Sequence, residues 1–445
     1  MEVLSLIGIF AGLILMIYLT FKGHSIIWVA PLSAFIVVLF ALGAGLGEDR
    51  TLLSSYTVDY MRGVGEYFIS WFPTFLLGAI YGKVMEMTGA ARALADLIVK
   101  LIGPRFVVLA VLIPCMLLTY GGVSLFVVVF IMYPMGYAIY KAADIPRTLL
   151  PAAIAFGSFG ITMTSIPGTP QIQNLIPMDY FGTTATAAPV MGIISSIIVL
   201  IPGYLYLNRR VKKARQDHLG FTEDPLILKE SETASKEAAV RYWLSGLIPL
   251  IVVFITLNLL KWNIVIALII GIIVCCLFHP DKLKRMPQTI TEGAKGSVTA
   301  IMNTACAVGF GSVIRIVPGF ALLTALLISQ NATPLSLLFS EALSTSVLSG
   351  ATGSASGGLS IALAAFADQY LAVAQTLGIS PDILHRVASI AAGSLDKLPH
   401  NGAVITLLAV SHCTHKESYK DIFVVSVIIP MIALVVLLLI WGIVL

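Results

Sequence analysis

The stretch SLDKLPHNGAVITLLAV, residues 394–410, places three ionisable residues within five positions of an apolar context: Asp396, Lys397 and His400. Ionisable side chains at membrane depth cost at least ~2.5–3.5 kcal/mol each on insertion scales, so they usually mark an ion or substrate path. Pro399 also cannot continue a helix. The stretch therefore predicts a membrane helix that is broken at residues 394–401, with ionisable groups at the break.

The rest of the chain is strongly apolar. Of its 445 residues 58% are hydrophobic and 11% are charged, whereas soluble domains have about 45–50% and about 25%. Uncharged runs such as 3–21 and 423–445 are long enough to cross roughly 30 Å of hydrocarbon as helices. A spanning backbone must be helical or covered by protein. We therefore expect an all-α polytopic membrane protein.

Three further polar, glycine-rich breaks interrupt the apolar sequence. They are TYGGVS at 119–124, TMTSIPGTPQIQN at 162–174 and SGATGSASGGLS at 349–360. Irregular backbone at membrane depth is tolerated only where it lines a cavity or is covered by protein. Each break leaves helix N-terminal ends, whose free N–H groups and partial positive charge suit a carboxylate. Packing kinks are the alternative interpretation, because small residues also let helices approach closely.

The breaks recur in the same order in the two halves of the chain. The matching positions are 121–125 with 357–361, 157–158 with 393–394, and 82–89 with 311–319. The first two pairs are offset by 236 residues and the third by 229. This shared order predicts an internal duplication, with a first repeat at 1–207, a cytoplasmic linker at 208–241 and a second repeat at 242–445.

Within each half the pattern predicts spans, a re-entrant hairpin, a broken helix and a last span. In the first half these are 3–21, 25–46, 66–88, an amphipathic segment at 90–104, a hairpin at 106–140, a helix from 148 that breaks at 162–170, and 188–207. In the second half they are 242–260, 263–279, 290–315, a hairpin at 334–372, a broken helix at 382–412, and 422–445.

Basic residues set the expected orientation, because loops rich in Lys and Arg stay in the cytoplasm. Arg209–Arg215 opens the long polar segment, which is therefore expected in the cytoplasm. Counting spans from it places Lys282–Arg285, Lys141 and the loop 412–420 on the same, cytoplasmic side. Glu48 and Asp49 are then external, and both termini lie outside. The two halves have opposite orientations, which is the inverted-repeat plan typical of secondary transporters.

The predicted substrate site lies between the two hairpin tips and the two broken helices, near the membrane midplane. The candidate substrate-binding residues are Tyr120, Gly121, Gly122, Ser124, Thr164, Gly168, Thr169, Gln171, Asn174, Ser354, Ser356, Gly357 and Asn401. His400 titrates near physiological pH and is a candidate for proton coupling. Asp396 is a second candidate if burial favours its protonated form. A structural Asp396–Lys397 ion pair and a neutral, hydrogen-bonded His400 are the alternatives.

Other cationic residues have simpler interpretations. We expect Arg209–Arg215 to set the topology and Arg315 to reach the membrane interface or a carboxylate. His385 and Arg386 are expected at the external end of the broken helix. The five cysteines show no metal-ligand spacing, so no metal or other cofactor is expected besides a coupling ion.

At the breaks the sequence resembles the gluconate permease family (GntP) of bacterial symporters. The matching stretches are GGVSLFVVVFIMYP at 121–134, IPRTLLPAAIAFGSFGITMTSIPGTPQIQNLIP at 145–177, SLDKLPHNGAVITLLAV at 394–410 and THKESYKDIF at 414–423. The resemblance implies a scaffold domain and a transport domain that moves as an elevator. It also implies a homodimer in the bacterial cytoplasmic (inner) membrane, with a small organic anion as substrate and no nucleic-acid partner.

Family members carry gluconate, other sugar acids, D-serine or 3-hydroxybutyrate together with protons. The second hairpin, TGSASGGLSIALAAF at 352–366, looks less like the sugar-acid members, and SLDKLPHNGA looks like the hydroxybutyrate or short monocarboxylate branch. The resemblance therefore favours proton symport of a small hydroxy acid such as 3-hydroxybutyrate, with a sugar acid as the alternative.

Three other functions remain to be weighed. A channel would need a continuous polar pore, whereas these breaks are local and paired. A membrane enzyme is not expected, because no nucleophile motif or metal spacing joins the Ser, His and Asp residues. Sodium coupling stays open, since broken helices also offer carbonyl oxygens to a cation.

Overall fold

The computed structural model describes residues 2–42, 50–223, 243–327 and 332–444, and these form helices and turns with no β-strand among them. The first-half helices are α1 (Glu2–Phe21), α2 (Ile26–Leu42), α3 (Leu52–Ser54), α4 (Met61–Met87), α5 (Ala90–Ile102), α6 (Val107–Tyr120), α7 (Leu125–Ala142), α8 (Leu150–Ala155), α9 (Ile161–Thr164), α10 (Ile172–Phe181) and α11 (Pro189–Gln216). The second-half helices are α13 (Trp243–Phe254), α14 (Ile264–Phe278), α15 (Met286–Ile316), α16 (Gly319–Leu327), α17 (Pro334–Thr352), α18 (Ala355–Leu377), α19 (Pro381–Leu395), α20 (Gly402–Val410), α21 (Lys420–Phe423) and α22 (Ile429–Val444).

Membrane-spanning length is reached by six continuous helical segments within the described residues. They are Glu2–Thr20, Leu52–Met87, Pro189–Gln216, Pro280–Ile316, Ala355–Leu377 and His415–Val444. Short 3₁₀ or π-helical turns join neighbouring helices within some of them, as at Ser55–Tyr60 and Val424–Ile428. The predicted all-α, multi-pass membrane fold is confirmed.

Both predicted hairpins are present. The arms α6 and α7 turn at residues 121–124, and the arms α17 and α18 turn at Gly353 and Ser354. Gly122 and Gly353 have φ of 90° and 60°, a left-handed conformation that glycine adopts without a steric cost. A Cβ atom on Gly358 would lie 2.1 Å from Cα of Ser349, so α17 and α18 meet without any intervening side chain.

Both broken helices are present as well. The first consists of α8, a π-helical turn at Phe156–Gly160, and α9, and resumes as α10 after the break at 165–171. The second consists of α19 and α20, separated by residues 396–401. These breaks lie where prolines and glycines interrupt the apolar sequence.

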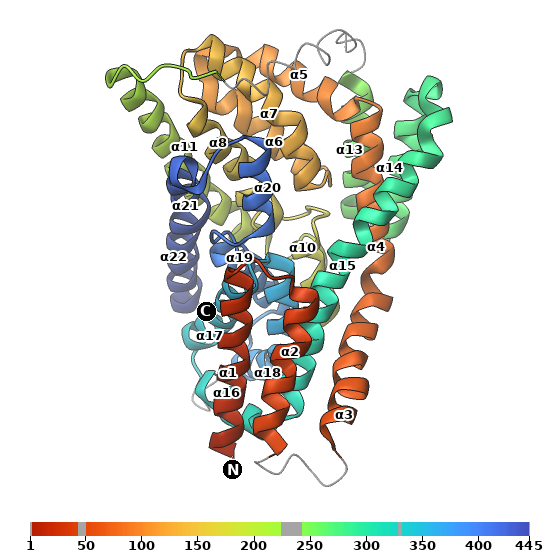
Figure 1. The fold of residues 1–445 in the computed structure, drawn as a ribbon, viewed down its shortest axis with the longest axis vertical. Helices are drawn as coiled ribbons and strands as arrows, with labels where there is room; N and C mark the ends of the chain where they lie inside the picture. Colours follow the sequence, from red (N-terminus) through yellow and green to blue (C-terminus); the bar gives the residue numbers. More distant parts are fainter. Residues whose placement is uncertain (1, 43–49, 224–242, 328–331, 445) are drawn as a thin grey trace.

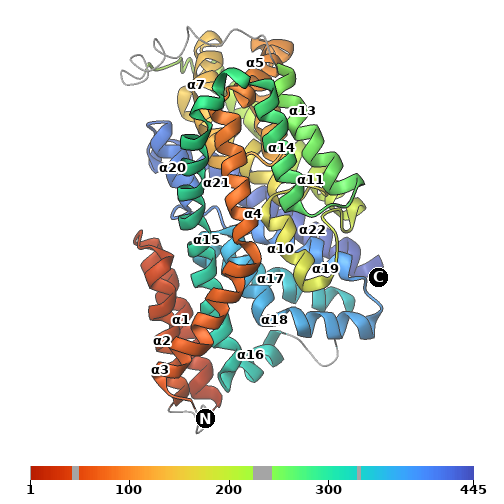
Figure 2. The ribbon, with the colours of Figure 1, turned by 90° about the vertical axis from the view of Figure 1, so that its right-hand side faces the viewer.

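Two long antiparallel helices, α4 and α15, pack along each other and lie on the right-hand side of the molecule in Figure 1 (see also Figure 2). Glycines allow the close approach: a Cβ atom on Gly63 would lie 2.1 Å from Oγ of Ser312, and one on Gly293 would lie 2.8 Å from Cα of Ile80. Around this pair, α2 packs on α15 as α14 packs on α4, and α1 packs on α16 as α13 packs on α5. The contacts are thus paired between the two halves, as a duplication requires.

Two boundaries differ from the prediction. The third span begins at Leu52 rather than near residue 66, because the polar run before it is also helical. The last span of the first half continues to Gln216, so residues 208–216 of the predicted linker form the end of α11. Hydropathy marks where a helix leaves the hydrocarbon, not where the helix ends. Residues 224–242, Glu48 and Asp49 lie outside the described residues, and the repeat boundaries remain a prediction.

Candidate substrate and ion site

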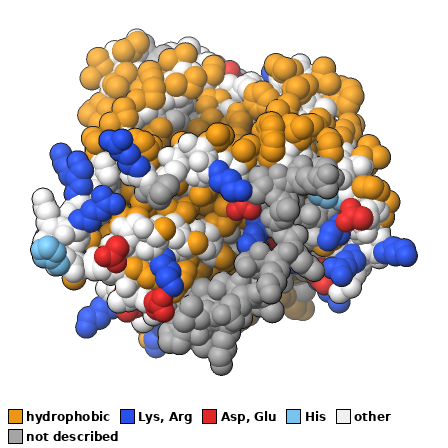
Figure 3. All heavy atoms as spheres, turned by 90° about the horizontal axis from the view of Figure 1, so that it is seen from above, with side chains coloured by type: hydrophobic (Ala, Val, Ile, Leu, Met, Phe, Trp, Pro, Cys, Tyr) orange, Lys and Arg blue, Asp and Glu red, His pale blue; other side chains and the backbone are white. Residues whose placement is uncertain are grey.

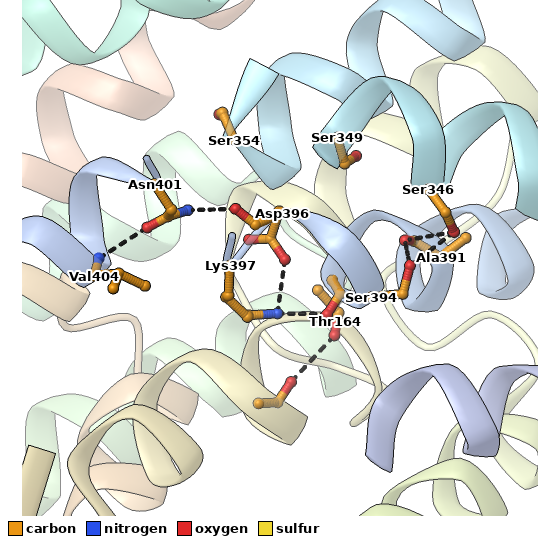
Figure 4. A network of polar contacts seen from close by, with 12 residues as sticks. Thr164, Ser346, Ser349, Ser354, Ala391, Ser394, Asp396, Lys397, Asn401 and Val404 are labelled. Atoms are coloured by element: carbon orange, nitrogen blue, oxygen red, sulfur yellow. Dashed lines mark hydrogen bonds and ion pairs between the residues drawn. The ribbon is translucent and has the colours of Figure 1, made fainter. Parts of the chain in front are cut away.

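The break between α19 and α20 contains a buried ion pair (Figure 4). Nζ of Lys397 lies 2.9 Å from Oδ1 of Asp396, and the two side chains are 2% and 6% exposed. The ammonium also donates to the carbonyl of Gly393 at 2.5 Å, and the hydroxyl of Tyr419 donates to the carbonyl of Lys397. Hydrogen bonds to Gly393 and Tyr419 therefore fix the position of Lys397, whose ammonium lies against the Asp396 carboxylate inside the protein.

Asn401 joins this break to the tip of the second hairpin. Its side-chain amide donates to the carbonyls of Gly353 and Asp396, both at 2.9 Å, and its Oδ1 accepts from the backbone N–H of Val404. His400 packs on the same tip, because a Cβ atom on Gly353 would lie 2.7 Å from Cδ2 of the imidazole. The second hairpin and the second break thus form one connected unit.

The first hairpin and the first break are joined in a similar way. Nε2 of Gln171 donates to the carbonyl of Thr119 at 2.7 Å, and the hydroxyl of Tyr120 donates to the carbonyl of Pro167 at 3.0 Å. Gly122 faces Pro170, which would lie 3.1 Å from a Cβ atom added there. Each half of the molecule therefore places a hairpin tip against a helix break.

The two breaks meet through Thr164, Asn174 and Arg386. Thr164, at the end of α9, packs directly on Gly393 beside Lys397 (Figure 4). Arg386, on α19, is 0% exposed and donates to Oδ1 of Asn174 at 2.9 Å and to the carbonyl of Ala187 at 2.8 and 3.1 Å. The two helix breaks thus touch each other, and each break also contacts the hairpin tip of its own half.

His385 and Arg386, which we expect at the external end of the broken helix, are both fully buried, and the side of the membrane on which they lie stays a prediction. His385 contacts Thr183 at 2.6 Å through Nδ1 and Asn174 at 3.3 Å through Nε2. The partners of Arg386 are carbonyl and amide oxygens, which are neutral, so its charge has no carboxylate partner among the described residues. In the sequence, this buried cation is indicated by the adjacent residues His385 and Arg386 within a mostly apolar helix.

The four helices that begin at the breaks are capped unequally. Ser354 caps α18 by accepting from the N–H of Gly357 at 3.1 Å, and Asn401 caps α20. At the start of α7 and α10, by contrast, Ser124 and Gln171 make no side-chain cap. The N-cap side chains thus satisfy one N–H group at each of the two second-half helix starts and none at the two first-half starts.

The remaining predicted residues form the borders of this region. Ser124 lies beside Gly82 of α4, and Ser356 contacts Thr304 of α15 at 3.4 Å, so each hairpin tip touches one of the two long antiparallel helices. Gly121 packs on Leu250, and the carbonyl of Gly168 accepts from Asn258 at 2.9 Å. The carbonyl of Thr169 accepts from Asn174. Gly168 and Gly357 contribute backbone rather than side chains.

Two cations outside the breaks are paired with carboxylates. Arg315 lies 2.9 Å from Asp368, as one of its two expected alternatives. Arg210, within the basic stretch, donates to both carboxylate oxygens of Asp421 at 2.7 and 3.0 Å, and Tyr206 donates to the same carboxylate at 2.6 Å. The basic stretch therefore also ties the last spans of the two halves together.

The described residues contain six helices long and apolar enough to cross a membrane, and two broken helices that contact each other. This architecture defines a multi-pass membrane transporter. The chain belongs to the Na+/H+ antiporter family, whose model matches residues 172–443. It is 39% identical over 464 aligned residues to the uncharacterized transporter YxjC of Bacillus subtilis, with 96% of each chain covered. It is 25% identical to the high-affinity gluconate transporter of Escherichia coli, over 68% of both chains. The predicted kinship with gluconate permeases is confirmed.

A solved structure supports the fold. Neisseria gonorrhoeae MtrF, described as illuminating a class of antimetabolite efflux pumps, superimposes with a TM-score of 0.58 and 14% identity. The alignment covers 97% of this chain and 95% of that one. At this identity the likeness concerns the arrangement of helices alone.

Proposed function

We propose that the protein is a proton-coupled symporter of a small hydroxycarboxylate such as 3-hydroxybutyrate. The observation that carries the proposal is the contact between the two helix breaks beside the buried Asp396–Lys397 pair, with each break joined to a hairpin tip. A region of irregular backbone, helix ends and buried charge inside a membrane protein is the usual site of a transported solute and its coupling ion.

The first half supplies the groups that favour an anion. The uncapped starts of α7 and α10 present backbone N–H groups and the positive ends of two helix dipoles. Lys397 and Arg386 add positive charge nearby, and Arg386 has only neutral acceptors among the described residues. Ser124, Thr164 and Gln171 then contact the carboxylate or the hydroxyl group of the substrate.

Asp396 and His400 are the proposed proton-coupling residues at this site. The Asp396 carboxylate forms an ion pair with the Lys397 ammonium at 2.9 Å. Protonation of the carboxylate would remove its negative charge, so the ammonium could then pair with a substrate anion. The His400 imidazole packs on Gly353 of the second hairpin tip, so gain or loss of a proton on the imidazole would change its contact with the tip. Sodium remains the alternative coupling ion, because the broken helices also expose carbonyl oxygens.

The relatives suggest alternative substrates and directions. The high-affinity gluconate transporter supports a sugar acid as the second candidate, and the family description supports exchange of sodium for protons. Matched relatives are transporters, and we propose that this chain likewise returns its substrate chemically unchanged.

We also propose the orientation, the motion and the assembly. The chain lies in the bacterial cytoplasmic membrane with its basic end inside, and Figure 3 views that end, where Lys and Arg side chains are scattered over the face. The N-terminus and the C-terminus lie in the lower part of Figure 1, away from this face. The hairpins and broken helices move as a transport domain against a scaffold that includes α4 and α15, in a homodimer.

Uptake into proteoliposomes tests the proposal. Labelled 3-hydroxybutyrate and gluconate are offered under an inward proton gradient, an inward sodium gradient, or no gradient. We expect saturable, uphill accumulation of 3-hydroxybutyrate with the proton gradient, and recovery of the unaltered compound from the vesicles. Flux that never exceeds equilibrium would indicate a channel, a modified product would indicate an enzyme, and sodium-driven accumulation would replace the proton.

A further inference from the structure

Glu341, in the middle of α17, has a carboxyl group that the protein buries completely. Its exposed fraction is 0%, and neither Oε1 nor Oε2 has a hydrogen-bond partner among the described residues. The burial is produced by the chain itself, so the side chain faces the protein interior and not lipid. Other buried carboxylates are compensated: Asp396 pairs with Lys397, and Asp421 pairs with Arg210. Glu341 is different from both.

The helices packed on α17 bring no countercharge to Glu341. These helices are α18, α19, α22 and α1. On α18 the titratable groups are Tyr370 and Asp368, and Asp368 is exposed and paired with Arg315. Tyr370 contacts Ser344, one turn from Glu341, at 2.9 Å. The surroundings of the carboxyl group are therefore hydroxyl groups and apolar side chains.

The other three helices are equally without a partner for it. No titratable residue is present in α22, and in α1 Glu2 and Tyr18 are exposed. On α19, His385 and Arg386 are bonded to the first-half residues described above, and Asp382 would repel a carboxylate. An ionised carboxylate buried without a partner is so costly that the group takes up a proton instead. Glu341 therefore carries a proton in this conformation.

Two buried hydroxyl groups continue from Glu341 toward the helix break. Thr345 and Ser349 follow at intervals of four residues and so share its face of α17. Both are 0% exposed, and neither hydroxyl oxygen has a hydrogen-bond partner among the described residues. Successive members are about 6 Å apart along a helix, a distance that one water molecule bridges. The row ends beside Gly350, which packs on Leu395 next to Asp396.

We propose that Glu341 is a proton-binding site of the transport cycle, in addition to the coupling residues at the break. The proposal rests on the proton symport proposed above. The carboxylate takes a proton from water on one side of the membrane, keeps it while the hairpin is packed as seen here, and gives it to water on the other side once the hairpin moves. Because the packing seen here buries Glu341 and disfavours its ionised carboxylate, the proton is released only when the hairpin moves.

Substrate exchange and gradient-driven uptake in proteoliposomes separate this role from a structural one. In Glu341→Gln the side chain keeps its shape but cannot release a proton. We expect exchange of 3-hydroxybutyrate at equal concentrations to persist, whereas accumulation driven by a proton gradient falls at least tenfold. The control is Asp368→Asn, an exposed carboxylate of the same hairpin, which should accumulate substrate as the wild type does.

If Glu341→Gln accumulates substrate under a proton gradient as the wild type does, the proposal is overturned. If Glu341→Gln loses only the accumulation that a sodium gradient drives, the proton is the wrong ion for this site. Infrared spectra of the purified full-length protein give a second measurement that needs no substrate. We expect a protonated carboxylic acid band at neutral pH that is absent in Glu341→Gln and shifted in Glu341→Asp. Absence of the band from the wild type overturns the proposal even if the variants do not fold. If the wild type shows the band but transports no carboxylate, the proposed function fails and the proton site stands.

Discussion

Gly393 and Thr164 are in direct contact: a Cβ atom on Gly393 would lie 2.8 Å from both Oγ1 and Cγ2 of Thr164. The first residue belongs to α19 and the second to α9, so this contact is where the two broken helices touch. The same Cβ atom would lie 3.2 Å from Nζ of Lys397, so the bare glycine also leaves room for the ammonium.

Gly393→Val should therefore force the broken helices apart. Overpacking of this kind usually costs about 1–3 kcal/mol, and here it also displaces Lys397. We expect uptake to fall at least tenfold in proteoliposomes while the protein still inserts. Gly402→Ala is the matched control, since its added Cβ meets nothing within 4 Å. Normal uptake by Gly393→Val would place the transport path elsewhere.

The Asp396–Lys397 pair should be needed for stability as a pair. Lys397→Met leaves a buried carboxylate alone, which typically costs about 3–5 kcal/mol. The double variant Asp396→Asn with Lys397→Met should recover most of the thermal stability in detergent but no uptake. If the single variant unfolds at the wild-type temperature, the pair is not the buried interaction that the geometry indicates.

Asp421 should act as a clamp between α11 and α21. Asp421→Asn removes the charge that accepts from Arg210 and Tyr206, and we expect a loss of about 1–3 kcal/mol, reduced from the buried case because the Arg210 side chain is 38% exposed. Thermal unfolding in detergent measures it. The neighbouring exposed Arg209 provides the control, and Arg209→Gln should change stability by less than about 0.5 kcal/mol. Equal effects of both variants would contradict the clamp.

His400→Ala should abolish pH-driven uptake while the protein still inserts in the membrane, because the imidazole lies in the second break against Gly353 and is a proposed proton-coupling group there. Uptake is compared at several external pH values against His24→Ala, an exposed histidine far from the breaks in sequence. Undiminished proton-driven uptake would remove His400 from the mechanism.

Most of the fold could be predicted because apolar sequence leaves the backbone few choices in a membrane. Glycine-rich polar interruptions at 119–124 and 349–360 predicted the hairpin turns seen at 121–124 and 353–354. Hydropathy failed where helices continue into polar sequence, as at Leu52 and at the end of α11. Charged and hydroxyl-bearing residues can be helical in water, so their polarity alone did not reveal the extra turns.

The site was predictable as a set of breaks but not as a set of contacts. Asn401 meets Gly353, 48 residues away, and Arg386 meets Asn174, 212 residues away. Nothing in the local sequence specifies such partners. The sequence therefore predicted Asn401 and Asn174 as substrate ligands, whereas this conformation uses their side-chain amides to join helices. It also passed over Glu341, because one carboxylate in a serine-rich helix looks like a surface residue.

The unequal capping at the breaks gives the substrate a structural task. The starts of α7 and α10 lack a side-chain cap from Ser124 or Gln171, whereas the corresponding starts of α18 and α20 have one. A bound carboxylate would supply the missing cap to the first half. If the carboxylate substrate proposed above binds there, it would stabilise these two helix starts, and the substrate-free protein would be the less stable form.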